Sequence, residues 1–491
     1  MTDMRATLER QRHAFMAELP VSIATRKDRL KRAAAMIADN ATRFCDALSE
    51  DFGHRSREQS MVTDIAGSIA PINHALRHVG RWARRDKRSV QFPLGLLGAR
   101  AWVEYQPKGV VGVIAPWNFP VNLVMGPIAG AFAAGNRVMV KTSEYTPRTA
   151  ALFEEVVGGY FASEELAFFS GGPEVGKTFA GLPFDHLLFT GATGIGRHIL
   201  HAAADNLTPV TLELGGKSPV IVGRSANLAQ AAERVAMGKM LNAGQICLAP
   251  DYMLVPAEAE PAMVEGLKRA AASMYPTLLA NPDYTSIVND RHFQRLSDWL
   301  DDARAKGARI ETVNPAGEDF SATNARKMPL TLVRNVTDDM VLMQEEIFGP
   351  ILPIRRYDGV DDAIAEVNRR ARPLGLYYFG SDADERRRVL DRTISGGVSL
   401  DDVIFHVSME DLPFGGIGPS GMGAYHGEDG FRTFSHARAV FKQAKLDVAK
   451  LAGIKPPYGP ATIKAARRQM KGQGARFGQI RRGAQPSRSI R

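Results

Sequence analysis

The feature that most constrains the fold of this chain is an alternation of short apolar runs with longer helical segments. Residues 109–115 (GVVGVIA), 137–140 (RVMV) and 186–189 (HLLF) are largely apolar runs of strand length. Segments with helical spacing separate them, for example residues 195–204. Such short apolar runs are typical of strands buried on both faces, and their alternation with helices predicts parallel sheets covered by helices. The sequence therefore predicts an α/β architecture.

The length of the chain predicts more than one domain. A chain of 491 residues is too long for a single hydrophobic core, so two or three domains are expected. The same alternation recurs within residues 216–407, where an apolar run at 219–222 precedes a helical segment at 228–241. Residues 6–48 have helical spacing, and residues 101–105 form a short strand pattern.

The net positive charge of the chain comes from its C-terminal end. The formal net charge is +9, but ten Lys or Arg residues and no acid follow residue 451. When these ten are subtracted from the 62 basic residues, 52 remain, against 53 acidic residues. Segment 446–491 has the composition of an unfolded, solvated tail, and weak contact with anionic lipid or RNA is the alternative. We favour the first interpretation and expect no specific nucleic-acid or membrane partner.

The cysteine content and the N-terminus indicate a cytoplasmic protein. The two cysteines, Cys45 and Cys247, form neither a disulfide framework nor a metal-binding pattern, so no metal is expected. The first 20 residues lack the apolar core of a signal peptide. No uncharged run approaches the roughly 20 residues needed to span a bilayer.

Residues 171–178 read GGPEVGKT, which satisfies the pattern of an ATP-binding P-loop. A P-loop opens a substantial helix, whereas Gly181 and Pro183 leave room for barely more than one turn. Glu174 would also repel phosphate oxygens, and no clear acidic motif for magnesium follows. A glycine-rich turn from strand to helix is therefore favoured over an ATP-dependent enzyme.

A second glycine-rich turn, residues 189–196 (FTGATGIG), connects an apolar strand to a helix. Gly191 and Gly196 would permit close backbone approach, and the start of the helix offers free N–H groups and the positive end of its dipole. The turn suits a pyrophosphate, although its spacing differs from the usual dinucleotide fingerprint. A purely structural turn is an equally good interpretation.

Three polar residues are candidates for catalysis. Cys247, in NAGQICLAPDY, has polar and flexible neighbours that would leave its sulfur accessible for attack on a carbonyl, whereas Cys45 fits an inert buried position. Glu213, between two leucines, is either a surface strand residue or a desolvated carboxylate with a raised pKa. Asn118, between two prolines, is either an oxyanion donor or a turn residue.

Taken together, these segments resemble the aldehyde dehydrogenase superfamily over nearly the whole chain, to about residue 444. The matching segments are APWNFP, VKTSE, FTGATGIG, LELGGKSP, GQIC, EEIFGP and LPFGGIGPSGMGAYHG, in the family's order. GQICLAPDY and GMGAYHGEDGFRTFSH resemble the class 3-like members, which include dimeric aromatic- and fatty-aldehyde enzymes. GGPEVG and FTGATGIGRHI are similar to the bacterial coniferyl-aldehyde dehydrogenases.

The resemblance implies a catalytic set. Cys247 would be the nucleophile, and Asn118 with the Cys247 backbone N–H would form the oxyanion hole. Glu213 would activate the water that hydrolyses the thioester, which favours hydrolysis over transfer of the acyl group to coenzyme A.

The resemblance also implies a nicotinamide cofactor. Lys141 and Glu144 would hold the adenosine ribose, and Gly191 and Gly196 the pyrophosphate. Glu346 would hold the nicotinamide ribose and Phe348 would pack near the nicotinamide, so GGPEVGKT becomes a loop beside the cofactor. A carboxylate at Glu144 should repel a 2′-phosphate, which favours NAD, with NADP as the alternative.

The expected fold class is a Rossmann-type NAD-binding domain, an α/β catalytic domain and a small β oligomerisation unit, which implies a homodimer. The expected bounds are 1–95 and 110–215 for the NAD-binding domain, 216–410 for the catalytic domain, 96–109 and 411–445 for the oligomerisation segments, and 446–491 for the tail.

The substrate is the least determined feature. Trp117, Phe119 and Phe405 would line an aromatic tunnel for coniferyl aldehyde or a similar aromatic aldehyde, although they are also compatible with core packing. A medium- or long-chain aliphatic aldehyde is the alternative within the family. Outside it, the alternatives are the P-loop enzyme and a non-catalytic NAD-binding protein, which would not need Cys247, Glu213 and Asn118 together.

Overall fold

The computed structural model describes residues 2–92, 94–323, 325–451 and 453–470. The chain divides into two compact units. We call the larger one, residues 1–83 and 105–436, the body, and the smaller one, residues 84–104 and 437–491, the arm. Residues 471–491 of the predicted basic tail lie outside the described residues.

The first sheet of the body has six strands in the order β15-β7-β6-β3-β4-β5. Strands β3 to β7 are parallel, and β15 pairs antiparallel with β7. Their bounds are β3 (Val110–Ile114), β4 (Arg137–Lys141), β5 (Leu166–Phe169), β6 (His186–Thr190), β7 (Val210–Glu213) and β15 (Gly421–Met422). The buried strands and their parallel order confirm the predicted α/β fold class.

Helices cover both faces of this sheet, because side chains of each strand alternate between two cores. Val111 and Val113 belong to the core shared with α2, α3, α5, α6 and α7. Val110 and Ile114 belong to the core shared with α1, α8 and α9. The bounds are α1 (Thr2–Glu18), α2 (Ile23–Asp39), α3 (Ala41–Phe52), α5 (Gly67–Trp82), α6 (Asn122–Ala134), α7 (Pro147–Val157), α8 (Pro173–Ala180), α9 (Thr193–Ala204) and α16 (Gly427–Thr433).

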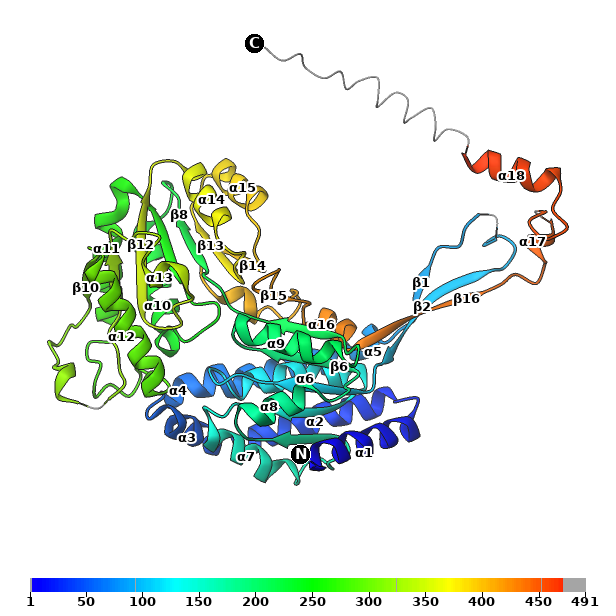
Figure 1. Ribbon diagram of the computed structural model, residues 1–491, viewed down its shortest axis with the longest axis horizontal. Coiled ribbons are helices and arrows are strands. Elements are labelled where there is room, and N and C mark those ends of the chain that lie inside the picture. The colour runs from blue at the N-terminus through cyan, green and yellow to red at the C-terminus, as the bar shows by residue number, and fades with distance from the viewer. Residues whose placement is uncertain (1, 93, 324, 452, 471–491) are drawn as a thin grey trace, which may run out of the picture. The chain divides into compact units, whose positions relative to one another are not determined.

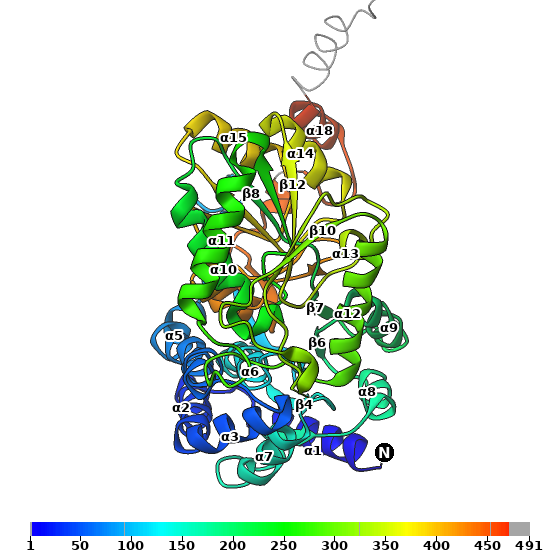
Figure 2. The same ribbon diagram turned by 90° about the vertical axis from the view of Figure 1, so that its left-hand side faces the viewer.

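The second sheet of the body has seven strands in the order β10-β11-β12-β9-β8-β13-β14, and all pairs except β10 with β11 are parallel. Helices surround this sheet (Figures 1 and 2). Buried side chains of its strands and helices form one apolar core. The bounds are β8 (Pro219–Val222), β9 (Tyr252–Pro256), β10 (Arg309–Thr312), β11 (Thr331–Arg334), β12 (Ile351–Tyr357), β13 (Gly375–Phe379), β14 (Gly397–Leu400), α10 (Leu228–Met240), α11 (Glu260–Met274), α12 (Asp290–Ala305), α13 (Val341–Gln344), α14 (Val360–Arg369) and α15 (Ala383–Arg392).

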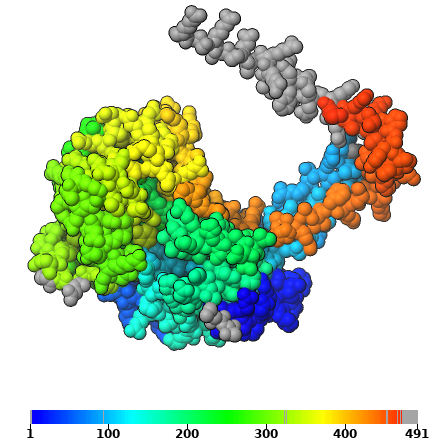
Figure 3. Space-filling model, viewed as in Figure 1, coloured from blue at the N-terminus to red at the C-terminus, as the bar shows by residue number. Residues whose placement is uncertain are grey.

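A third, three-stranded sheet has the order β1-β2-β16, from Asp86–Arg88, Arg100–Pro107 and Ser435–Lys442. Figure 3 shows β2 in light blue beside β16 in orange within the arm. The small sheet expected in the fold class is therefore present. Beyond it, the arm contains the helices α17 (Val448–Leu451) and α18 (Pro460–Met470).

Candidate active site

A cavity of about 1070 Å³ lies at the carboxyl ends of the parallel strands β3, β4, β6 and β7. This is the edge at which open α/β sheets bind ligands. Residues from both sheets of the body line it, and nine of the twelve predicted site residues are among them. Those nine are Trp117, Asn118, Lys141, Glu144, Gly191, Glu213, Cys247, Glu346 and Phe348.

The chain just before Cys247 adopts an unusual backbone conformation. Asn242, Ala243 and Gly244 all have positive φ angles, of 52°, 52° and 72°. Two of the three are not glycine, so this conformation is strained and needs support from neighbouring groups. Gln245 provides part of it, because its side-chain amide donates to the Asn242 carbonyl at 2.9 Å. Sequence patterns gave no signal for this turn.

The Cys247 thiol is only partly exposed, and its environment disfavours the thiolate. Burial, followed by the nearby carboxylates of Glu346 and Glu213, raises the pKa of Cys247 to about 12. The flexible neighbours of Cys247 predict an accessible sulfur, but the fold encloses it more than its local sequence indicates. Attack by Cys247 on a carbonyl would therefore require the thiol to lose its proton first.

Glu213 is the last residue of β7, and its side chain is fully desolvated. It is 3% exposed, and neither carboxylate oxygen has a hydrogen-bond partner among the described residues. Burial raises its pKa well above the usual range. Of the two interpretations of Glu213, the desolvated carboxylate is the one observed.

The glycine-rich segment after residue 412 explains part of this burial. Gly421 in β15 pairs with Glu213 in β7, and Leu214 N–H donates to the Ser420 carbonyl at 3.1 Å. A Cβ atom on Gly421 would lie 2.3 Å from the Leu212 carbonyl oxygen, so only glycine fits there. The segment thus closes over the end of β7 as an additional strand.

Glu346 is a second acidic side chain whose carboxylate is only partly hydrogen-bonded. Gly216 N–H donates to its carboxylate, but Oε1 has no partner among the described residues. Burial and then the charge of Asp251 raise the pKa of Glu346 to about 8. A Cβ atom on Gly215 would lie 2.2 Å from both carboxylate oxygens. The Gly-Gly pair after Glu213 is therefore needed for Glu346 to approach the strand end.

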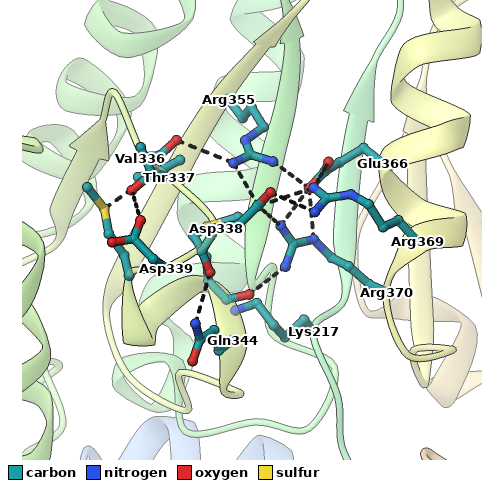
Figure 4. A network of polar contacts seen from close by, with 12 residues as sticks. Lys217, Val336, Thr337, Asp338, Asp339, Gln344, Arg355, Glu366, Arg369 and Arg370 are labelled. Carbon is teal, nitrogen blue, oxygen red and sulfur yellow. Dashed lines mark hydrogen bonds and ion pairs between the residues drawn. The ribbon is translucent and has the colours of Figure 1, made fainter. Parts of the chain in front are cut away.

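A network of charged residues holds the segment that leads to Glu346 (Figure 4). Lys217 Nζ donates to the carbonyls of Leu342 and Glu345, at 2.8 and 2.9 Å. Asp338 and Glu366 each accept ion-pair hydrogen bonds from the same three arginines. Those arginines are Arg355, Arg369 and Arg370. The segment from Asp338 to Glu345, directly before Glu346, is thus held by groups from β12, α14 and the β7–β8 connection.

Asn118 is buried next to the loop of Cys247. Its Nδ2 donates to the Gln245 carbonyl at 3.1 Å. Its own carbonyl accepts from Asn242 Nδ2 at 3.2 Å and from the Arg55 guanidinium at 2.8 Å. The Asn118 side-chain amide therefore binds the backbone two positions before Cys247. A developing oxyanion next to Cys247 would need a hydrogen-bond donor in this place.

The predicted ribose-binding residues lie at the end of β4. Lys141 Nζ and a Glu144 carboxylate oxygen are 3.0 Å apart. Gly191 lines the cavity, whereas Gly196 packs α9 against Leu214, because its Cβ atom would lie 2.8 Å from that side chain. The role of Gly196 in this structure is thus close helix packing.

The segment that resembles a P-loop forms α8, and the prediction of barely more than one turn was too short. The helix has eight residues, about two turns. Glu174, Gly176 and Lys177 line the same cavity as Cys247. This position fits the prediction of a loop beside a cofactor.

The three predicted tunnel aromatics lie in different surroundings. Trp117 lines the cavity. Phe119 stacks against the Arg55 guanidinium, 5.1 Å from its ring centroid, and Phe405 is 48% exposed; neither lines this cavity.

Two aromatic neighbours of Trp117 were missed by sequence reasoning. The rings of Tyr145 and His292 lie 6.4 and 5.1 Å from the Trp117 ring, centroid to centroid, and the Phe348 ring lies 5.4 Å from it. His292 stands at the start of α12, 175 positions after Trp117 in the sequence. No local pattern relates residues so far apart.

The described residues contain neither a candidate metal-binding cluster nor a membrane-spanning helix. No group of three or more His, Cys, Asp or Glu side chains is arranged to hold a metal ion. No helix in those same ranges is long and apolar enough to cross a membrane.

The cavity suits a dinucleotide. It is large, it begins at the positive end of α9, and it contains a carboxylate oxygen of Glu346 and an amine–carboxylate pair that can bind sugar hydroxyls. Cys247 and Glu213, whose carboxylate has no hydrogen-bond partner among the described residues, line the same cavity. A thiol and a desolvated acid in a dinucleotide-sized cavity are compatible with an oxidoreductase that uses a nicotinamide cofactor.

Comparison with known proteins gives the family. Residues 2–440 match the model of the aldehyde dehydrogenase family. The chain is 54% identical to the "Probable coniferyl aldehyde dehydrogenase" of Caulobacter vibrioides, covering 95% of this chain and 97% of that one. It is 53% identical to the "Coniferyl aldehyde dehydrogenase" of a Pseudomonas species, covering 93% and 94%. A substrate-bound structure of Staphylococcus aureus AldH superimposes with a TM-score of 0.87, at 35% identity, covering 95% and 99%.

This chain belongs to the aldehyde dehydrogenase family, and it is an NAD(P)-dependent aldehyde dehydrogenase. The prediction of family, fold class and enzyme class from the sequence is confirmed.

Proposed function

We propose that this protein oxidises coniferyl aldehyde, or a closely similar aromatic aldehyde, to the carboxylic acid, with NAD as the preferred cofactor. The observation that carries the activity is the position of Cys247 beside the desolvated Glu213 in a dinucleotide-sized cavity. The names of the two relatives above 50% identity support the substrate class.

In the first half-reaction, Cys247 Sγ attacks the aldehyde carbon and forms a thiohemiacetal. The oxyanion accepts hydrogen bonds from Asn118 Nδ2 and the Cys247 backbone N–H, which requires Asn118 to turn away from the Gln245 carbonyl. A nicotinamide cofactor, when bound, would supply the hydride acceptor. As the thiohemiacetal held on Cys247 reforms its C=O bond, the C–H bond breaks, its hydride leaves to that acceptor, and a thioester remains on Cys247.

In the second half-reaction, Glu213 removes a proton from a water molecule whose oxygen attacks the thioester carbon. The C–S bond breaks, the carboxylic acid leaves, and Cys247 is regenerated. The raised pKa of Glu213 makes its carboxylate a strong base in this buried position. As the C–S bond breaks, Glu213 can return that proton to the sulfur, which regenerates the Cys247 thiol.

For the cofactor, we propose that Lys141 and Glu144 bind the adenosine ribose, that Glu346 binds the nicotinamide ribose, and that Phe348 packs near the nicotinamide. Gly191 would lie against the pyrophosphate. The partner-free Oε1 of Glu346 is available for a hydroxyl donor. A carboxylate at Glu144 supports NAD over NADP, because a 2′-phosphate would be repelled.

For the substrate, Trp117 supports an aromatic aldehyde, and a medium- or long-chain aliphatic aldehyde is the second candidate. The apolar and aromatic lining of the cavity is compatible with both.

We also propose that the protein is a homodimer. Phe92, Leu96 and Phe441 of the arm are exposed apolar side chains, and a second copy of the chain would bury them. Light scattering coupled to size-exclusion chromatography should give twice the monomer mass.

The test of the activity is the absorbance of reduced cofactor at 340 nm, with coniferyl aldehyde or decanal and with NAD or NADP. We expect the fastest rate with coniferyl aldehyde and NAD. Cys247→Ala should abolish the rate, whereas Cys45→Ala, the matched control in the buried core, should retain it. A silent wild type with both aldehydes and both cofactors would refute the proposal, and faster turnover of decanal would transfer the substrate assignment to the aliphatic class.

A further inference from the structure

A fully buried ion pair lies next to the active-site turn and has no part in the proposed chemistry. Arg55 and Asp64 are both 0% exposed in their side chains, and their charged groups are 2.6 Å apart. They flank α4 (Arg57–Ser60) and the first half of the π-helical turn η1 (Met61–Ala66). Such wide turns within helices are frequent at functional sites.

Arg55 binds the backbone of Asn118 directly. Its guanidinium donates to the Asn118 carbonyl at 2.8 Å. The same group lies over the rings of Phe52 and Phe119, 4.8 and 5.1 Å from their centroids. The planar guanidinium is therefore fixed in one orientation, and it fixes the peptide of Asn118 with it.

Asp64 binds the other end of the turn that carries Asn118. One of its carboxylate oxygens accepts from Val121 N–H at 3.2 Å. The neighbouring Thr63 carbonyl, in the wide turn η1, accepts from the Asn122 side-chain amide at 2.7 Å. The turn that carries Asn118 is thus attached to this segment both at Asn118 and three residues beyond it.

Gln59 attaches the same segment to the strained loop before Cys247. Its Oε1 accepts from Asn242 N–H at 3.0 Å, and its Nε2 donates to Asn242 Oδ1 at 3.4 Å. Asn242 in turn donates from Nδ2 to the carbonyls of Asn118 and Gln245, both at 3.2 Å. One short segment therefore contacts both loops that would surround the reacting carbonyl.

Stability alone does not account for the buried pair. Burial raises the pKa of Asp64 and lowers the pKa of Arg55, so desolvation opposes both charges. Buried ion pairs of this kind often contribute little net stability, and apolar side chains of similar volume can replace them. What an apolar pair could not supply is the directed hydrogen bonds to Asn118 and Val121.

We propose that Arg55, Asp64 and Gln59 are positioning residues that hold Asn118 and the Cys247 loop in the arrangement needed for the oxyanion. This inference rests on the proposed roles of Asn118 and Cys247. None of the three needs to touch the substrate, and they act through the backbone of Asn118 and through Asn242.

The test compares Arg55→Lys with Arg29→Lys in the full-length protein. Arg29, on α2 of the body, is the matched buried arginine: its side chain is 1% exposed and pairs with Glu18 and Glu165, and none of these three residues lines the cavity. A lysine at 55 keeps the charge but cannot bind Asp64 and the Asn118 carbonyl together. Hydride transfer in single turnovers should fall about 10- to 100-fold for Arg55→Lys, as expected for a misplaced reacting group.

Three further measurements separate positioning from general loss of structure. For Arg55→Lys, the cofactor dissociation constant and the rate of Cys247 alkylation by iodoacetamide should stay within about twofold of wild type, because neither uses the oxyanion donor. The KM for the aldehyde should change much less than kcat. Gln59 is partly exposed, and leucine has a similar volume but cannot form its two hydrogen bonds to Asn242. Gln59→Leu should therefore slow hydride transfer several-fold.

The outcomes are separable from those of the proposed function. An inactive wild type would refute the proposed function itself. An active wild type with Arg55→Lys no slower than Arg29→Lys would overturn the positioning proposal, and so would a loss in which cofactor binding and alkylation fall equally. If Arg55→Lys does not fold, Gln59→Leu decides, and a wild-type rate in that variant would overturn the proposal.

Discussion

Acidic side chains in the body of this protein fall into two groups whose pKa values are shifted in opposite directions. At the end of β7, Glu213 has no hydrogen-bond partner among the described residues, and burial raises its pKa. About the β12–α14 region, Asp338 and Glu366 each contact three arginines, and the pKa of each is lowered. For Glu366, burial alone would raise the pKa, but hydrogen bonds from Arg369 and Arg370 outweigh it.

The difference separates groups that support the fold from groups that are available for chemistry. A carboxylate that is saturated with arginines is a weak base and holds its neighbours in place. A carboxylate that is desolvated and unpaired destabilises its own charged form and therefore takes up protons readily. Substitution of an unpaired acid and of a paired acid should therefore have opposite consequences for activity and for stability.

Glu213→Gln should affect chemistry and leave the fold intact. Steady-state oxidation should fall roughly 1,000-fold, because the base for hydrolysis is lost, while a single burst of reduced cofactor remains. Stopped-flow absorbance at 340 nm gives both quantities. Glu366→Gln, the same change in a paired acid, should retain the steady-state rate within about twofold at 25 °C. A Glu213→Gln variant at full rate would remove the distinction between the two acids.

Glu366→Gln should instead destabilise the fold. Loss of its charged hydrogen bonds should lower the free energy of unfolding by about 2 kcal/mol, measured by urea titration at pH 7. Glu213→Gln should be as stable as wild type or more so, since it removes a desolvated acid. If both variants lost the same stability, the two regions would not differ in the way described.

Glu346→Gln should make the Cys247 thiol more acidic. After burial, Glu346 is the first charge that raises the pKa of Cys247, so its removal should lower that pKa. Alkylation by iodoacetamide at pH 8 should become roughly threefold to tenfold faster, and its pH profile should move to lower pH. The exposed neighbour provides the control, because Glu345→Gln should leave the profile unchanged.

The contributions of Glu346 and Asp338 to stability should depend on pH in opposite directions. The pKa of Glu346 is raised from 4.5 to about 8, so its contribution to stability falls as pH rises through that interval. The hydrogen bond from Arg369 lowers the pKa of Asp338 from 3.8 to about 2, so its contribution is lost as pH falls through that interval.

Two variants test these pH-dependent contributions to stability, measured by urea titration at a series of pH values. Asp338→Asn should reduce stability near pH 5 and converge with wild type near pH 2. Glu346→Gln should flatten the decline in stability between pH 5 and pH 8. Asp384→Asn, at an exposed position on α15, should follow wild type throughout. If the stability of Glu346→Gln declined with pH as steeply as that of wild type, the raised pKa of Glu346 would not account for the decline.

Much of the fold and part of the site were predictable because their signals are local. The apolar runs that predicted strands became β3, β4, β6 and β8, since burial on both faces selects such residues. Glu213 and Asn118 were recognisable as unusual by their immediate neighbours. The length of α8 was predicted too short, because the helix already begins at Pro173, within the glycine-rich segment, and continues to Ala180.

Other features had no local signal. Whether Glu213 was exposed depended on β15, which arrives from more than 200 positions later in the chain. Of the predicted aromatics, Phe119 was directed against Arg55 and Phe405 towards solvent, whereas His292 came to Trp117 from α12.

The sequence by itself determined the α/β class and the family, and it proposed the candidate reactive groups, because strand burial and short motifs are encoded in adjacent residues. Only the tertiary structure decided which acids stayed without a partner and which were paired with arginines. The physical reason is that desolvation and hydrogen bonding at Glu213, Glu346 and Asp64 arise from segments far apart in the chain, and a pKa depends on all of them at once.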